Sequence, residues 1–105
     1  MQITYSCKGL SDMSIKSWEG KINIIRFLHP FEFSINARGS SFQLILGHYE
    51  YGYYVCIPNW KIGCDISTLS DIFWNMENLC AAGLDIVDAI TIVDALEVLE
   101  NYIDL

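Results

Sequence analysis

Residues 38–75 read RGSSFQLILGHYEYGYYVCIPNWKIGCDISTLSDIFWN, and this stretch decides the fold. Apolar and polar side chains alternate in SSFQLIL and again in GYYVCIP, which is typical of β-strands. The linking HYEY and Gly52 suit a hairpin loop of about four or five residues. Pro58 ends the second run, and beyond it apolar residues recur at spacings of three and four. The stretch therefore predicts a β-hairpin that leads into a helix.

The alternation extends toward the N-terminus and also assigns the faces of the strands. Three further strands are predicted, at residues 3–7, 20–30 and 31–38. Within residues 20–30 the alternation slips once, which indicates either a bulge or burial of both faces. The side chains that share one face of their strand are Phe31, Phe33 and Ile35, then Phe42, Leu44 and Leu46, and then Tyr53, Val55 and Ile57. We expect the middle set of these three to face the core.

Two helices are predicted in the last third of the chain. The first has Ser67 or Thr68 as its N-cap and ends at Gly83. Its apolar stripe comprises Leu69, Ile72, Phe73, Met76, Leu79 and Cys80. The second follows Asp85, which stands three residues before Asp88 in an acidic variant of the capping box. Its core face comprises Ile92, Ala95, Leu96, Leu99, Tyr102 and Ile103.

Strands that come first and helices that follow predict an α+β fold. We expect an antiparallel sheet of about four to five strands with two C-terminal helices packed on one face. At 105 residues and 12.0 kDa, the chain fits a single domain, residues 1–105. The strands are expected within residues 1–58 and the helices within 67–104.

The residue types that hold metals or perform catalysis are few and scattered. The four cysteines, Cys7, Cys56, Cys64 and Cys80, form no CxxC pair, and only two histidines are present. We therefore expect no metal, no cofactor and no enzymatic activity, with the cysteines serving as small buried apolar groups. The catalytic alternative is a nucleophile pair of Cys56 and His48, which facing strands would bring together.

The chain shows neither a secretory leader nor a membrane span. The N-terminus, MQITYSCKGLSDMS, lacks the charged and then apolar layout of a signal peptide. Glu50, Pro58 and several glycines interrupt the most apolar region before it reaches the roughly 18 residues of a membrane span. These features predict a protein of the bacterial cytoplasm without membrane association.

Charge is distributed unevenly along the chain, whose net charge is −7. All six basic residues lie in residues 1–66, together with five of the 13 acidic residues. Residues 67–105 contain the other eight acidic residues and no basic one. Such an anionic segment argues against direct binding of nucleic acid, because phosphate repels carboxylate. A basic protein is the partner that this charge predicts.

The last helix offers the most regular set of charges. We predict that Asp94, Glu97, Glu100 and Asp104 bind the partner, because they place one charge per roughly 4 to 5 Å of helix axis. One strand of a nucleic-acid duplex carries one phosphate per ~3.4 Å, so the helix resembles a nucleic-acid backbone loosely. The alternative interpretation is a solvated face that keeps an apolar domain soluble.

Aromatic residues are the second candidate for binding. Tyr49 and Tyr51 lie at the predicted hairpin tip, where they suit a protein interface. Trp60 and Phe73, with Asn59, either line a pocket or pack in the core, and core packing is the commoner use of aromatic residues.

Four motifs resemble a known family. RGSS (38–41), IPNW (57–60), IGC (62–64) and LSDIFWN (69–75) are similar to a small uncharacterised family carried on mobile genetic elements of Gram-positive bacteria. The chain also resembles anti-CRISPR proteins that inhibit the RNA-guided nuclease of type II systems. That resemblance implies a non-enzymatic inhibitor, carried by phages or other mobile elements, that binds the nuclease and obstructs its guide RNA or target DNA.

Three functions remain open from the sequence. The first is an anti-CRISPR-like inhibitor that binds a basic effector nuclease through its acidic surface, as a monomer or homodimer. The second is a non-enzymatic accessory or regulatory protein of a mobile element. The third is a small nuclease acting on guide RNA, in which Asp65, Asp71 and Glu77 would hold Mg²⁺.

Overall fold

A computed structural model describes residues 1–66 and 76–104, which form six strands, three 3₁₀ turns and two α-helices. The strands are β1 (Gln2–Ser6), β2 (Met13–Ser14), β3 (Phe31–Ala37), β4 (Ser40–Tyr49), β5 (Gly52–Ile57) and β6 (Ile62–Ile66). The 3₁₀ turns are η1 (Ile15–Ser17), η2 (Ile24–Arg26) and η3 (Pro58–Trp60). The α-helices are α1 (Met76–Ala81) and α2 (Ile86–Glu100).

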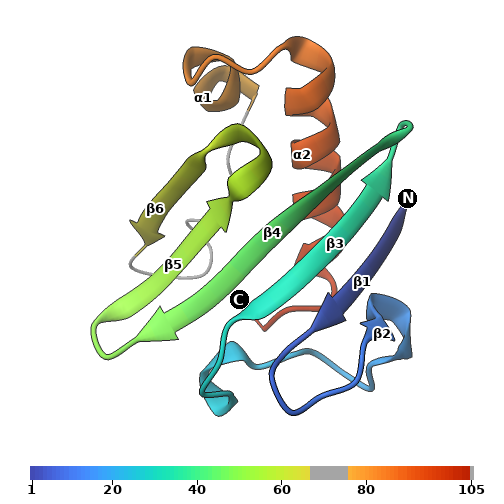
Figure 1. The fold of residues 1–105 in the computed structure, drawn as a ribbon, viewed down its shortest axis with the longest axis vertical. Coiled ribbons are helices and arrows are strands. Elements are labelled where there is room, and N and C mark those ends of the chain that lie inside the picture. The colour runs from blue at the N-terminus through green and yellow to red at the C-terminus, as the bar shows by residue number, and fades with distance from the viewer. Residues whose placement is uncertain (67–75, 105) are drawn as a thin grey trace.

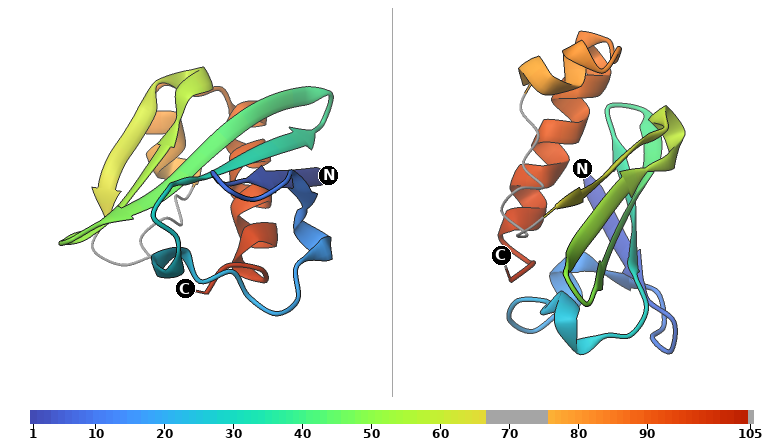
Figure 2. Two further views of the ribbon diagram at one scale, coloured as in Figure 1. Left: turned by 60° about the horizontal axis from the view of Figure 1, so that its bottom comes forward. Right: turned by 90° about the vertical axis from the view of Figure 1, so that its left-hand side faces the viewer.

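The six strands pair in antiparallel fashion into one sheet with the order β2-β1-β3-β4-β5-β6 (Figure 1). Helix α2 lies along one face of this sheet, and α1 lies beside the N-terminal end of α2 (Figure 2). The α+β prediction is confirmed, and the sheet has six strands where four to five were expected. In the part of the chain that the structure describes, no helix has the length and apolar character that crossing a membrane requires.

The core lies between the sheet and α2. Period-two alternation places Phe33 opposite Leu44 and Leu46 opposite Val55, all on the helix-facing side of the sheet. Helix α2 meets them with the face that the sequence predicts. Its buried side chains there are Ile92, Ala95, Leu96 and Leu99, and Ile103 beyond the helix end is buried as well. The prediction that Phe42, Leu44 and Leu46 of β4 face the core is therefore confirmed, and the set of β3 faces the core as well.

The β3–β4 hairpin turns through Arg38 and Gly39, whose φ angles are 54° and 75°. Positive φ at both central residues is the signature of a type I′ turn, which matches the twist of paired strands. Glycine adopts this conformation freely, whereas an arginine pays about 1–2 kcal/mol for it. An arginine at this position therefore indicates a role for its side chain.

The β4–β5 hairpin is tighter than predicted. Strand β4 continues to Tyr49, which pairs with Gly52, so only Glu50 and Tyr51 form the turn and the expected loop of four or five residues is wrong. Gly47, farther along β4, leaves room for the side chain of Tyr54, its partner on β5. A Cβ at Gly47 would lie 2.4 Å from the Tyr54 ring, so the ring occupies the space above the glycine on the outer face of the sheet.

The predicted strand at residues 20–30 is wrong. Its centre is the 3₁₀ turn η2, at the place where the alternation slips. The side chain of Asn23 accepts a hydrogen bond from the backbone N–H of Ile25 at 3.2 Å, and such local bonds compete with a strand ladder. Ile22 makes an isolated parallel bridge with Ile103 instead, so this segment contacts the end of α2.

Helix boundaries agree with the sequence where the structure describes them. The side chain of Asp85 accepts from the N–H of Asp88 at 2.8 Å and caps α2. Gly83, with φ 100°, ends α1, because N–H groups of Gly83 and Leu84 bond the carbonyls of Cys80 and Leu79. The predicted N-cap at Ser67 or Thr68 lies outside the described residues.

Strand β6 contradicts the expectation that all strands lie within residues 1–58.

Candidate protein-binding surface

Helix α2 carries the predicted acidic residues on its outward side. Asp94, Glu97 and Glu100 follow one another at a spacing of three, so they occupy successive turns of one face. Glu97 and Glu100 are exposed, Asp94 is partly buried, and Asp104 is exposed beyond the helix end.

Asp94 has a partner within the chain. Arg38 reaches from the β3–β4 turn and donates to the Asp94 carboxylate at 2.6 Å, with about half of the Arg38 side chain exposed (51%) and 39% of that of Asp94. An ion pair this exposed contributes about 0–1 kcal/mol to stability. Trp60, in the 3₁₀ turn η3 that follows β5, donates its indole N–H to Asp88 at 3.3 Å. Two of the acidic residues of α2 therefore hold the helix to the sheet.

Glu97, Glu100 and Asp104 remain without an ion pair among the described residues, and we call them the acidic end. They lie at or near the C-terminus of α2, where the helix dipole is already negative and where carboxylates are disfavoured by about 0.3–1 kcal/mol each. The last turn of α2 has no basic residue to compensate. Helix stability therefore does not account for the placement of these three carboxylates.

The β4–β5 hairpin exposes the two predicted tyrosines. The exposed fractions are 43% for Tyr49 and 83% for Tyr51. The structure adds two apolar residues that the sequence analysis did not single out, Ile25 at 57% and Leu28 at 96% exposure. The segment that carries them is attached to the hairpin, since the Nε2–H of His48 donates to the carbonyl of Phe27 at 2.8 Å. We call Ile25, Tyr49, Glu50 and Tyr51 the hairpin patch.

The acidic end and the hairpin patch belong to the same end of the molecule. The N–H of Asp104 donates to the carbonyl of Ile22 at 2.9 Å, two residues before η2 begins. The C-terminus, η2 and the β4–β5 turn all lie in the lower half of the view in Figure 1. Residues 22–28 thus connect the two candidate surfaces, which lie far apart in the sequence.

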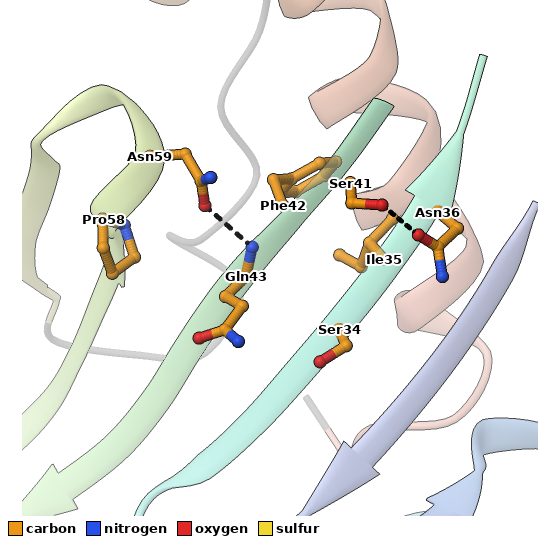
Figure 3. Close-up of a pocket in the computed structure, with 8 residues that line it drawn as sticks. All are labelled: Ser34, Ile35, Asn36, Ser41, Phe42, Gln43, Pro58 and Asn59. Carbon is orange, nitrogen blue, oxygen red and sulfur yellow. Dashed lines mark hydrogen bonds between the residues drawn. The ribbon is translucent and has the colours of Figure 1, made fainter. Parts of the chain in front are cut away.

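The open face of the sheet carries a separate, uncharged depression of about 520 Å³ (Figure 3). The side-chain oxygen of Asn59 accepts from the backbone N–H of Gln43 at 3.0 Å, at the point where Pro58 ends the β4–β5 pairing. The Ser41 hydroxyl donates to Asn36 across the β3–β4 pair. Asn59 of the IPNW motif therefore bonds a backbone N–H of β4 beyond the residue pairs that β4 forms with β5. The next residue of the motif, Trp60, packs edge-on against Phe42 with ring centroids 5.2 Å apart.

The catalytic alternatives find little support in the geometry. His48 lies two residues after the inward-facing Leu46 and therefore points to the helix-facing side of the sheet. Cys56 pairs with the outward-facing Ile45 and therefore points to the opposite side. The two side chains are therefore not a nucleophile pair. Within residues 1–66 and 76–104, no group of three or more His, Cys, Asp or Glu side chains is arranged to hold a metal ion. Asp71 and Phe73 lie outside these ranges.

Three cysteines are free thiols in different surroundings. Cys7 is buried and donates to the carbonyl of His29, Cys56 is partly buried, and Cys80 is exposed. Burial raises the pKa of the Cys7 thiol and of the Cys56 thiol. The expectation of buried thiols is confirmed for Cys7 and is wrong for Cys80. The side chain of Cys64 lies outside the described part.

We expect these thiols to react with iodoacetamide in the order Cys80, Cys56, Cys7. A raised pKa leaves less thiolate at neutral pH, and the buried Cys7 requires local opening, so its rate should be lower than that of Cys80 by roughly tenfold or more. Labelling of Cys56 should accelerate as the pH rises toward its raised pKa. Peptide mass spectrometry at successive times measures all three rates. Equal rates for Cys7 and Cys80 would contradict the burial described above.

The family model of a Family of unknown function (DUF6618) matches residues 3–104. The chain belongs to this family. No curated protein and no solved structure matches the chain. The DUF6618 match spans both the acidic end and the hairpin patch, so both surfaces lie within the family's shared region.

Proposed function

We propose that this DUF6618 protein is a non-enzymatic binding protein that uses the acidic end and the hairpin patch to bind a basic protein. The proposed partner is the effector nuclease of a type II CRISPR system, whose guide RNA or target DNA the bound protein would obstruct. The finer proposal comes from the resemblance to anti-CRISPR proteins of mobile genetic elements. The binding role rests on the surface chemistry of one end of the molecule.

The observation that carries the binding role is the exposure of the hairpin patch. Tyr49, Tyr51 and Ile25 present 43%, 83% and 57% of their surface to solvent, and they come from two segments that His48 joins. Tyrosine is enriched in protein interfaces, because its ring offers a large contact area and its hydroxyl can still bond water or a partner. The exposure of these aromatic and apolar side chains at one hairpin supports a role in protein binding.

The acidic end supports a basic partner. Glu97 and Glu100 lie in the last turn of α2, where their charge interacts unfavourably with the helix dipole, and no ion pair among the described residues offsets this loss of stability. Carboxylates in such a position attract a basic surface and raise the rate of encounter with it. Binding should therefore weaken as salt rises, since the screening length falls from ~10 Å at 0.1 M to ~3 Å at 1 M.

A pull-down from a bacterium that carries a type II effector nuclease tests the proposal. The tagged protein is used as bait with and without added guide RNA, and the bound proteins are identified by mass spectrometry. We expect recovery of the nuclease, and recovery only without guide RNA would indicate obstruction of guide loading. Failure to recover the nuclease in either arm, while another mobile-element protein is recovered, would favour the accessory role instead.

A further inference from the structure

The hairpin patch borders a depression of about 420 Å³ that lies between the β4–β5 hairpin and η2. Ile25 lines it from the η2 side, and the lining residues from the hairpin are His48, Tyr49, Glu50, Gly52 and Tyr53. The hydrogen bond from His48 to the Phe27 carbonyl holds these two sides together. The depression is therefore formed by two parts of the chain that are fixed to each other.

The aromatic side of the depression is held in place. Tyr49 pairs with Gly52 across the hairpin, and a Cβ at Gly52 would lie 3.6 Å from the Tyr49 hydroxyl. The same Cβ would lie 3.0 Å from the Ile66 carbonyl oxygen, a tight contact, so the glycine at this position lets the end of β6 approach the hairpin. The ring thus rests over Gly52 with 43% of the residue still exposed.

One carboxylate, that of Glu50, lines the depression beside the tyrosine rings. Glu50 is exposed, and among the described residues it has neither an ion pair nor a hydrogen bond. Arg26 and Lys21 belong to the neighbouring segment but do not line the depression. An apolar occupant would desolvate Glu50 without compensation, and an anionic occupant would be repelled by it. A cationic occupant satisfies the carboxylate.

We propose that this depression receives an arginine or lysine side chain of the basic partner. The aliphatic stem would lie along Ile25, and the cationic group would contact the Tyr49 ring and the Glu50 carboxylate. Long basic side chains bury their methylene stem against apolar surface, and they bind tyrosine faces through cation–π attraction. This inference rests on the proposed binding role and adds the residue type at the centre of the contact.

Peptide titrations followed by NMR test this assignment. The probe is an acetylated (Arg-Gly)₃ amide, and the matched control is the same peptide with neutral citrulline in place of arginine. We expect the arginine peptide to shift the backbone amide signals of Glu50, Gly52 and Ile25, and the citrulline peptide to shift them far less. A lysine version of the peptide distinguishes the two possible basic residues.

Variants separate the depression from the acidic end. Glu50→Gln and Tyr49→Leu should each weaken arginine-peptide binding by roughly two- to fivefold, whereas Tyr49→Phe retains the ring and should restore it. Glu32→Gln, on the open face of the sheet, is the matched control and should change little. Dispersed amide spectra of each variant verify the fold.

Three results would overturn the assignment. These are shifts confined to residues 97–104, equal shifts with the citrulline peptide, and no shift at millimolar peptide. The first result would still support a basic partner that binds the acidic end, and it would reject only the depression as the place where the basic side chain binds. The pull-down described above reports on the partner independently, so the two proposals can fail separately.

Discussion

Replacing Trp60 with alanine is expected to lower the free energy of unfolding by about 2–4 kcal/mol, a large part of the stability of a small domain. Trp60 packs edge-on against Phe42 and donates its indole N–H to Asp88, so it joins the sheet to α2. The residue is only partly buried, which places the expected loss toward the lower end of the range for tryptophan truncation. Urea unfolding followed by circular dichroism measures it.

Two milder variants separate the contributions of Trp60. Trp60→Phe keeps most of the ring packing and loses the indole N–H, and Asp88→Asn keeps an acceptor without the charge. Each should cost about 1 kcal/mol or less, since a hydrogen bond of this kind contributes about 0.5–1.5 kcal/mol. If Trp60→Ala unfolded at the same urea concentration as the unaltered protein, the IPNW motif would have no role in holding α2.

The sequence predicted the parts of the fold in which one period dominates. Strand β3 alternates along its whole length and β4 alternates from Phe42 to Leu46, and the inward side chains of both stretches are buried where the pattern places them. Helix α2 was predicted from its three- and four-residue spacing although many of its residues are β-branched. Burial of Ile92 and Leu99 against the sheet outweighs the weak helix propensity of such residues.

The errors fall where local hydrogen bonds or neighbouring strands override the pattern. Residues 20–30 contain enough isoleucine for a strand, but Asn23 caps a 3₁₀ turn there. Strand β6 has little alternation of its own, because Gly63 takes one of its positions, and it forms by pairing with β5. The residues of β6 alone do not reveal that β5 offers a free edge with which they can pair.

The candidate site was predicted in part. The acidic residues and tyrosines were identified from charge and composition, and both sets are largely exposed. The ion pair of Asp94 with Arg38 joins residues 56 positions apart and left no local signal. Ile25 was missed because it was assigned to a strand, and its exposure follows from the 3₁₀ turn. The depression beside Tyr49 depends on that turn and was therefore not predictable.

If the acidic end binds the proposed basic partner, reversing it to lysine (Glu97→Lys, Glu100→Lys and Asp104→Lys together) should weaken that binding by on the order of 100-fold. Three reversed charges replace attraction with repulsion toward a basic surface, and a loss of about 1 kcal/mol at each gives this factor. Isothermal titration calorimetry at two salt concentrations measures the effect. The difference between unaltered and reversed protein should shrink at high salt. Reversal of Asp12 and Glu32, which are exposed elsewhere, is the matched control.

The melting temperature distinguishes a binding surface from a solvated one in this experiment. Lysine near the C-terminus of α2 complements the helix dipole, so the triple reversal should leave the melting temperature unchanged or raise it. Asp94→Lys should lower it instead, because the new cation would face Arg38. Weaker binding by a protein that is at least as stable can only come from lost contacts with the partner. Full binding by that stable variant would reduce the acidic end to a solvated face and leave the hairpin patch, with Tyr49 and Tyr51, as the contact.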